Sequence, residues 1–127
     1  MNCPDCGAAT VAFAVPDDLR ELFDEPAAAL CTRCLVLHSV ESADANPDFA
    51  AVSDDFPTDA AAVPMALTVG LLDSLALHRG AVETLLERVE RKGTDPLLVL
   101  DRLASDPSLD PNIDLTTRRR QVAQFRD

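Results

Sequence analysis

Two Cys-x-x-Cys pairs constrain this chain more than any other feature of its sequence. Cys3 and Cys6 form the first pair, Cys31 and Cys34 form the second, and the 127 residues contain no other cysteine. Two such pairs can place four thiolates around one Zn²⁺ ion in a closed tetrahedral shell, which is typical of structural zinc sites. The sequence therefore predicts one structural zinc ion bound by these four cysteines. A single iron ion also accepts four sulfur ligands, so the pattern leaves the metal open.

The residues beside each pair favour turns that close on a metal. Pro4 restricts the backbone within the first turn, and Gly7 permits the positive φ that lets N–H groups point at sulfur. Leu35 holds the equivalent place after the second pair, so we expect that turn to be less regular. The 24 residues between the pairs exceed the usual spacing of about 15 to 20. A short helical turn over residues 17–23 would account for the extra length.

The cysteines have a second chemical interpretation. A Cys-Pro-x-Cys pair also occurs in thiol oxidoreductases, and it would make this chain a thiol redox or metal-responsive sensor with a low thiolate pKa at Cys3 or Cys6. That reading needs a βαβ unit after the first pair and leaves the second pair unexplained. Disulfides are disfavoured, because the sequence shows neither a secretory signal nor an apolar run long enough to span a membrane. We therefore expect a cytoplasmic protein with no membrane contact.

The two histidines do not indicate catalysis. His38 lies four residues after Cys34, close enough to be a substitute ligand or to contact one, although a strand position facing solvent or the sheet core is the simpler expectation. His78 is expected to be a capping or surface residue. Neither has a nucleophile and an acid near it in sequence, so no catalytic triad is predicted. We expect a non-enzymatic protein with no catalytic residues and no organic cofactor.

Residues 1–40 are predicted to form a zinc ribbon. Apolar residues alternate with alanines over 10–15, the period of a half-buried strand. Residues 27–30 and 35–40 would complete a small antiparallel sheet. One cysteine turn would precede the first strand, and the other would lie between the second and third strands. A core alone is rarely sufficient below about 40 residues, so the metal is expected to supply folding free energy.

Residues 41–62 are predicted to be an acidic Ala/Asp/Pro connector with a short helix. Asn46 and Pro47 resemble an N-cap and a first helical residue. The apolar side chains of this segment recur at helical spacing and are expected to pack onto the helices that follow. They are Phe49, Val52 and Phe56.

Residues 63–127 are predicted to form a bundle of about four helices, which makes the fold class α+β. The first helix, residues 65–77, is apolar nearly all round, and a break is expected at Arg79 and Gly80. Such a helix is buried centrally or in an interface. A homodimer through residues 65–77 would cover it if the chain itself does not. Further helices are expected up to Lys92, over 96–104 and over 115–125.

Charge bears on the choice of partner. The formal net charge is −11, and residues 1–64 carry twelve acidic side chains against two basic ones. With 16 Asp and a single Lys, the composition is typical of a halophilic protein, whose carboxylates hold water and maintain solubility. The absence of Trp and Tyr excludes a large aromatic platform for single-stranded nucleic acid.

The one basic run is formed by Arg118, Arg119 and Arg120. Phosphate contacts through this run would give weak nucleic-acid association. Pairing with the chain's own carboxylates is the simpler expectation, so nucleic acid is not the expected partner. We expect a protein partner, and the sequence identifies neither that partner nor its cellular process.

Several segments together resemble a family of small haloarchaeal proteins of unknown function. They are Cys-Pro-Asp-Cys-Gly at 3–7, Leu-Cys-Thr-Arg-Cys-Leu at 30–35, Gly-Leu-Leu-Asp-Ser-Leu-Ala-Leu at 70–77 and Asp-Pro-Ser-Leu-Asp-Pro at 106–111. The resemblance spans nearly the whole chain. It implies a cytoplasmic zinc-ribbon protein with no known activity.

Overall fold

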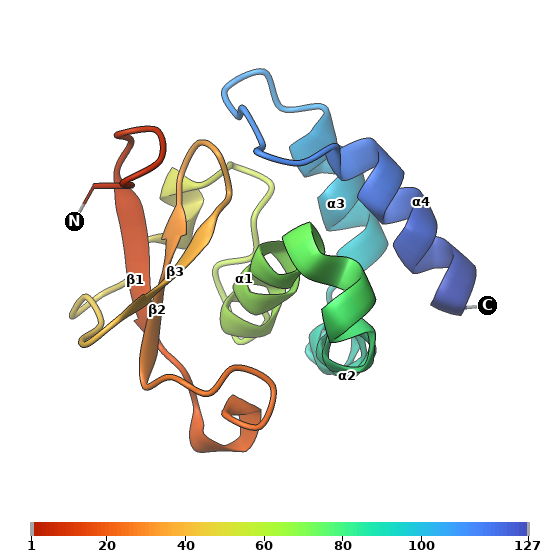
Figure 1. Cartoon of the computed structure of the whole chain (residues 1–127), viewed down its shortest axis with the longest axis horizontal. Helices are drawn as coiled ribbons and strands as arrows, with labels where there is room; N and C mark the ends of the chain where they lie inside the picture. Colours follow the sequence, from red (N-terminus) through yellow and green to blue (C-terminus); the bar gives the residue numbers. More distant parts are fainter. Residues whose placement is uncertain (1, 127) are drawn as a thin grey trace.

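A three-stranded antiparallel sheet forms one side of the molecule, and the helices form the other (Figure 1). The computed structural model describes residues 2–126, and the side chains of residues 125 and 126 lie outside the described part. The sheet comprises β1 (Thr10–Ala14), β2 (Ala27–Cys31) and β3 (Leu37–Val40), with β2 in the centre. This arrangement confirms the α+β class and the antiparallel sheet.

The predicted alternation in the first strand is confirmed. Val11, Phe13 and Val15 are buried and belong to the main hydrophobic core. All five residues of β2 are buried, as the central strand of a covered sheet requires. The open edge of β1 is paired as well, because Ala12 donates its N–H to the Asp44 carboxylate and accepts a hydrogen bond from the Asp44 N–H. The connector therefore protects this edge from pairing with other chains.

The long spacing between the cysteine pairs has the predicted cause. The 3-10 helix η1 (Asp17–Leu19) and the turns after it follow β1 and lead into β2. Leu19 is buried in the core and holds this excursion against the body of the protein. Asp18 of η1 accepts a hydrogen bond of 2.6 Å from Arg88 in the second helix, and this contact lowers the pKa of the Asp18 carboxyl.

The connector contains a shorter helix than the sequence predicts. Only η2 (Phe49–Ala51) is helical, and its cap is Asp48, whose side chain accepts the N–H of Ala50, rather than Asn46. The predicted packing is nevertheless confirmed. Phe49 lies between Phe13 and Phe56, with ring centroids 5.5 and 5.9 Å away, and all three rings are buried.

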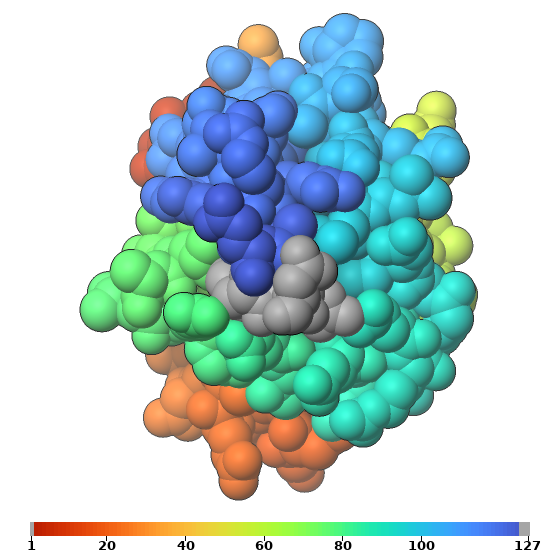
Figure 2. Space-filling view, turned by 90° about the vertical axis from the view of Figure 1, so that its right-hand side faces the viewer, coloured from red at the N-terminus to blue at the C-terminus, as the bar shows by residue number. Residues whose placement is uncertain are grey.

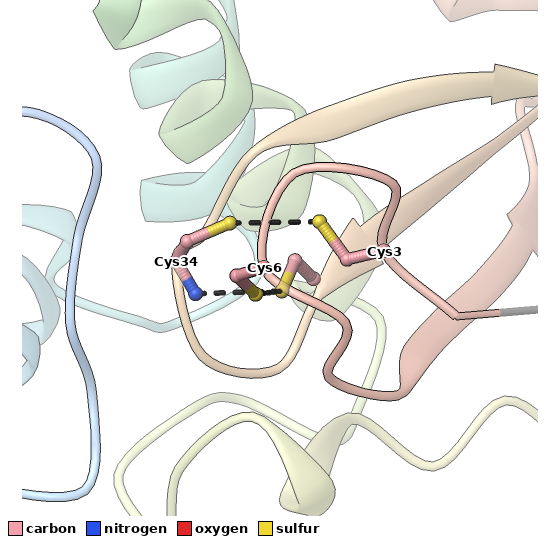
Figure 3. A group of neighbouring side chains, drawn as sticks. Cys3, Cys6 and Cys34 are labelled. Carbon is pink, nitrogen blue, oxygen red and sulfur yellow. Dashed lines mark hydrogen bonds between the residues drawn. The ribbon is translucent and has the colours of Figure 1, made fainter.

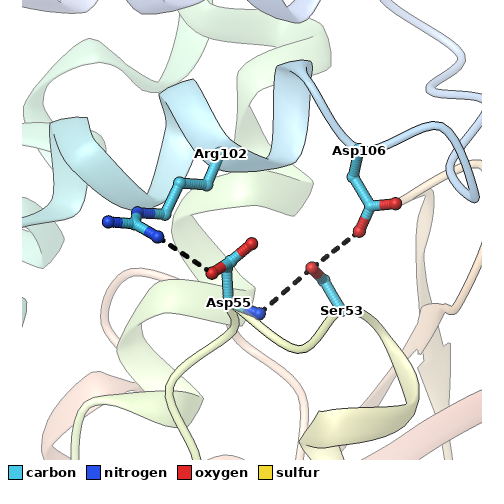
Figure 4. A network of polar contacts seen from close by, with 4 residues as sticks. All are labelled: Ser53, Asp55, Arg102 and Asp106. Atoms are coloured by element: carbon cyan, nitrogen blue, oxygen red, sulfur yellow. Dashed lines mark hydrogen bonds and ion pairs between the residues drawn. The ribbon is translucent and has the colours of Figure 1, made fainter.

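A polar network joins the connector to the helical region (Figure 4). The buried Ser53 hydroxyl donates to Asp106 at 2.8 Å, and Arg102 pairs with Asp55 at 3.1 Å. Asp106 also accepts hydrogen bonds from the hydroxyl and the backbone N–H of Ser108, and these contacts together with Ser53 lower the pKa of the Asp106 carboxyl.

The helical region comprises α1 (Ala62–Leu71), the 3-10 turn η3 (Leu72–Ser74), α2 (Leu75–Arg91), α3 (Pro96–Ala104) and α4 (Leu115–Arg126). Several helix boundaries agree with the sequence. Asp95 caps α3 before Pro96, Asp114 caps α4, and Gly93, at φ 87°, ends α2. Within the described residues, no helix is long and apolar enough to cross a membrane.

A break lies close to the predicted position. Helical residues continue from 62 to 91, but α2 is kinked at His78, whose φ and ψ are −114° and 19°, one residue before the predicted break at Arg79 and Gly80. The turn at η3 is a second interruption, which the sequence did not predict. The helical region thus has three helical stretches separated by loops, the first of them bent, rather than about four separate helices. The bend turns Leu77 outward, where it is 84% exposed, whereas Leu72 is fully buried.

The core is shared between the sheet and the helices. One cluster of buried apolar residues runs from Val11 in β1 to Val122 in α4. Helix α1 lies between the sheet and the other helices (Figure 1) and approaches β3 closely at Gly70. A Cβ atom at Gly70 would lie 2.4 Å from the Cβ of Leu37. Only glycine permits this approach without a shift of the backbone.

Candidate metal centre

The two cysteine turns meet at one end of the sheet. The first turn precedes β1, and the second joins β2 to β3. A backbone hydrogen bond closes each turn, from the Cys3 N–H to Ala8 O at 2.7 Å and from the Cys31 N–H to Val36 O at 3.0 Å. The Thr32 N–H donates to Ala9 O at 3.0 Å and so ties the second turn to the first.

This arrangement brings the four cysteine sulfurs together, each within 4.8 Å of the others. The Cys3 and Cys34 sulfurs face each other at 3.7 Å (Figure 3). The Cys6 and Cys31 sulfurs lie 3.4 Å apart. Sulfur ligands placed tetrahedrally about 2.3 Å from a zinc ion would be about 3.8 Å apart. The donor set and its spacing therefore fit a tetrahedral metal ion. All four cysteines are free of disulfides.

Both turns direct backbone N–H groups at their sulfurs in the same pattern. The first cysteine of each pair accepts hydrogen bonds from the residues two and three positions later. For Cys31 these donors are Arg33 and Cys34, both at 3.4 Å, and for Cys3 they are Asp5 and Cys6. The second cysteine accepts one from the residue two positions later. Backbone dipoles thus favour thiolate at all four positions, as metal binding requires.

The expected irregularity of the second turn was wrong. Leu35 adopts φ 63°, the left-handed region that Gly7 adopts at φ 81° in the first turn. Leu35 is only 5% exposed and faces a small cavity with Val69 and Leu115 of the helical region. Apolar packing therefore holds a side chain where a glycine would be easier, and the turn keeps its geometry.

Burial distinguishes the four sulfurs. Cys3, Cys31 and Cys34 are buried, whereas Cys6 is exposed. Burial raises the pKa of the Cys31 and Cys34 thiols. The Ala8 backbone N–H and the Cys31 side chain lower the pKa of Cys6 to about 7. Without a metal, Cys6 is thus the accessible thiolate of the group.

His38 lies beside this group rather than away from it. Its Nε2 atom is 3.5 Å from the Cys3 sulfur, and the ring is half-buried on β3. Burial opposes ionisation of Cys3, but hydrogen bonds from His38 and from the Cys6 and Asp5 backbone lower its pKa overall. The expected strand position of His38 is confirmed, but its ring contacts a cysteine, which the sequence offered only as the alternative, from its distance to Cys34. Asp5, the third member of a group with Cys3 and His38, was missed as a donor.

The helical region also reaches the second turn. The N–H of Asp110 donates to Arg33 O at 2.8 Å, and the N–H of Asn112 donates to Cys34 O at 3.0 Å. Both donors lie in the loop between α3 and α4, within and just after the Asp-Pro-Ser-Leu-Asp-Pro segment. The second cysteine turn is therefore held from two sides, by the first turn and by this loop.

The basic run on α4 is partly paired within the chain. The Arg119 Nε atom lies 2.8 Å from the Asp101 carboxylate on α3, and Arg118 donates to Gln121 at 2.9 Å. His78 lies at the bend of α2, half-buried. Neither the basic run nor His78 contributes to either donor group found among the described residues.

Comparisons with known proteins give one match. No curated protein and no solved structure matches the chain. The model of a family of unknown function, DUF6276, matches residues 2–126, and the chain therefore belongs to that family.

Proposed function

We propose that this protein is a non-enzymatic binding module built around one structural zinc ion held by Cys3, Cys6, Cys31 and Cys34. The observation that carries the proposal is the mutual proximity of the four sulfurs, within 4.8 Å. Four thiolates fill a tetrahedral shell and leave no position for a substrate or an activated water. Three of the four sulfurs belong to buried residues, which suits a permanent ion rather than a reactive one.

The surface proposed for binding lies on the side of the molecule formed by α2 and α4 (Figure 2). A groove of about 400 Å³ runs between the start of α2 and α4, lined by Leu75, Ala76, Arg79, Arg118, Gln121 and Gln124. Leu77, beside this groove in sequence, is 84% exposed. A lining that combines apolar side chains with arginines and amides suits an acidic, partly apolar segment of a protein partner.

Metal analysis tests the first half of the proposal. Protein purified without added metal should contain one equivalent of zinc, and all four thiols should resist labelling until a chelator removes it. One equivalent of iron would keep the centre and change the metal. No stoichiometric metal, or thiols that react equally fast with and without chelator, would refute the metal centre.

Affinity capture with matched variants tests the second half. Ala76→Asp places a negative charge in the groove lining and should release the proteins retained by the wild type, whereas Leu98→Asp should retain them. Leu98 is 46% exposed on α3 and lies outside the groove lining. Equal capture by both variants would refute binding through this groove.

A thiol redox or metal-responsive sensor is the second candidate, favoured by the exposed Cys6 and its pKa of about 7. This function predicts rapid, selective reaction of Cys6 with an electrophile in the metal-loaded protein, followed by metal release. The structural role predicts slow reaction and a retained ion.

A further inference from the structure

The four-cysteine group has a neighbour that shares one of its members. The Cys3 sulfur, an Asp5 carboxylate oxygen and a His38 ring nitrogen all lie within 4.8 Å of one another. Cys3 is the one residue common to this group and to the four-cysteine group among the described residues. His38 and Asp5 thus adjoin the four-cysteine group at Cys3.

These three donors are chemically suited to a divalent ion. Thiolate, imidazole and carboxylate are the usual zinc ligands, and three protein ligands leave a position open to water. Asp5 is exposed and His38 is half-buried, so the two face solvent more than the shared Cys3 does. By contrast, three of the four sulfurs of the inner group are buried.

We propose that Cys3, Asp5 and His38 form an outer metal site through which the divalent ion passes into and out of the four-cysteine centre. The inference rests on the proposed metal centre. A hydrated ion exchanges waters for the Asp5 carboxylate, the His38 imidazole and the Cys3 sulfur. It then moves inward around Cys3, whose bond to the metal persists throughout.

Each step of this transfer is a ligand exchange with no change in oxidation state. Bonds from the metal to Asp5 and His38 break as bonds to the remaining three sulfurs form. Thiol protons leave to solvent, because only thiolates bind the metal. The reverse sequence returns the ion to solvent or to a chelator. The outer site therefore accelerates loading and release equally and leaves the equilibrium affinity unchanged.

The equal effect on loading and release distinguishes a transfer site from a His38 that only donates a hydrogen bond to a metal ligand. A residue that only donates a hydrogen bond to a metal ligand changes the equilibrium affinity when it is removed, typically by about 10- to 100-fold. A residue on the transfer route changes both rates by the same factor. Asp5→Asn makes the distinction sharper, because it removes only the carboxylate. The backbone N–H that residue 5 donates to the Cys3 sulfur is retained.

The test uses the full chain and Co²⁺, whose thiolate absorption reports entry into the four-sulfur shell. Stopped-flow loading, chelator-driven release and equilibrium competition are measured for the wild type, Asp5→Asn and His38→Gln. Glu21→Gln and His78→Gln are the controls, because they remove one acid and one imidazole remote from the cysteines. Asp5→Asn changes only an exposed side chain of the turn, so it stays informative if His38→Gln fails to fold.

We expect Asp5→Asn to slow loading and release together, by about tenfold, the scale of local electrostatic and ligand effects on association, with the affinity unchanged. His38→Gln should slow loading by a similar factor, but its affinity should also fall, because it removes the contact of His38 with the Cys3 sulfur. Both controls should remain at the wild-type values. Unchanged loading rates in both variants, or an affinity loss in Asp5→Asn due only to faster release, would overturn the outer site. Those results would leave the four-cysteine centre standing, whereas a wild type that binds no Co²⁺ would overturn both.

Discussion

Leu35 offers a sharp test of the second cysteine turn, because two opposing effects meet at one residue. Its backbone has φ 63°, and its side chain is 5% exposed in the main core. Truncation of a buried leucine to alanine typically costs about 2–5 kcal/mol of stability. Leu35→Ala loses this packing and keeps a Cβ atom in the left-handed region.

Leu35→Gly loses the same packing but relieves the backbone. A residue with a Cβ atom pays about 1–2 kcal/mol in the left-handed conformation. Glycine offsets part of this gain, because the greater conformational entropy of its unfolded chain lowers stability by about 0.5–1 kcal/mol. The difference leaves Leu35→Gly more stable than Leu35→Ala by about 1 kcal/mol, although both are less stable than the wild type.

The matched control is Leu30, which is fully buried in β2, a regular strand. There Leu30→Gly should be less stable than Leu30→Ala by about 0.5–1 kcal/mol, because glycine weakens a strand. The assay is urea unfolding followed by circular dichroism at a fixed free Zn²⁺ concentration, since bound metal stabilises the folded state by mass action. The reasoning about the turn would be refuted if Leu35→Ala were as stable as Leu35→Gly, or more stable, while Leu30→Gly remained less stable than Leu30→Ala.

Three further predictions concern the way the helical region holds the sheet and the metal centre. Gly70→Ala should lower the free energy of unfolding by about 1–2 kcal/mol, because overpacking against β3 outweighs the gain in helix propensity. Gly80→Ala, where a Cβ meets nothing within 4 Å, should raise the free energy of unfolding. The pKa of Asp106 is lower in the folded protein than in the unfolded chain. The stability that its carboxylate contributes is therefore complete above the unfolded pKa of about 4 and is lost as the pH falls through the folded pKa. Urea midpoints of wild type and Asp106→Asn should therefore differ at pH 7 and converge in acid. Removal of the metal should speed hydrogen exchange at the Thr32 and Asn112 amides while the amides of the central strand stay protected; uniform deprotection of the sheet would contradict this.

Much of this fold could be predicted from the sequence because the signals are local. Cap residues such as Asp95 and Asp114 act on the backbone a few residues away, so their effect is visible in a short window. The alternation in the first strand and the spacing of the cysteines are equally local. These signals located most of the helices, the strands and the four clustered thiols.

The features that were missed depend on contacts between distant segments. The turn at η3 contains neither proline nor glycine, so no breaker residue marks it in the sequence, whereas the kink at His78 lies beside the predicted break at Arg79 and Gly80. The left-handed Leu35 is held by residues of α1 and α4 that adjoin it only in space. Hydrogen bonds to the carbonyls of Arg33 and Cys34 come from backbone N–H groups, which leave no side-chain signature in the sequence.

These long-range contacts change what the metal has to stabilise. A ribbon of about 40 residues on its own would depend on its ion for folding, but this sheet shares its core with α1 and the later helices. We therefore expect the burial of β2 and the close approach at Gly70 to hold the strands whether or not an ion is bound. What remains for the metal is the junction beyond the strands, where the first turn, the second turn and the loop between α3 and α4 meet. An ion bound there would connect the N-terminal residues to the helical region through the two hydrogen bonds of that loop, so we expect its loss to loosen the junction and not the sheet.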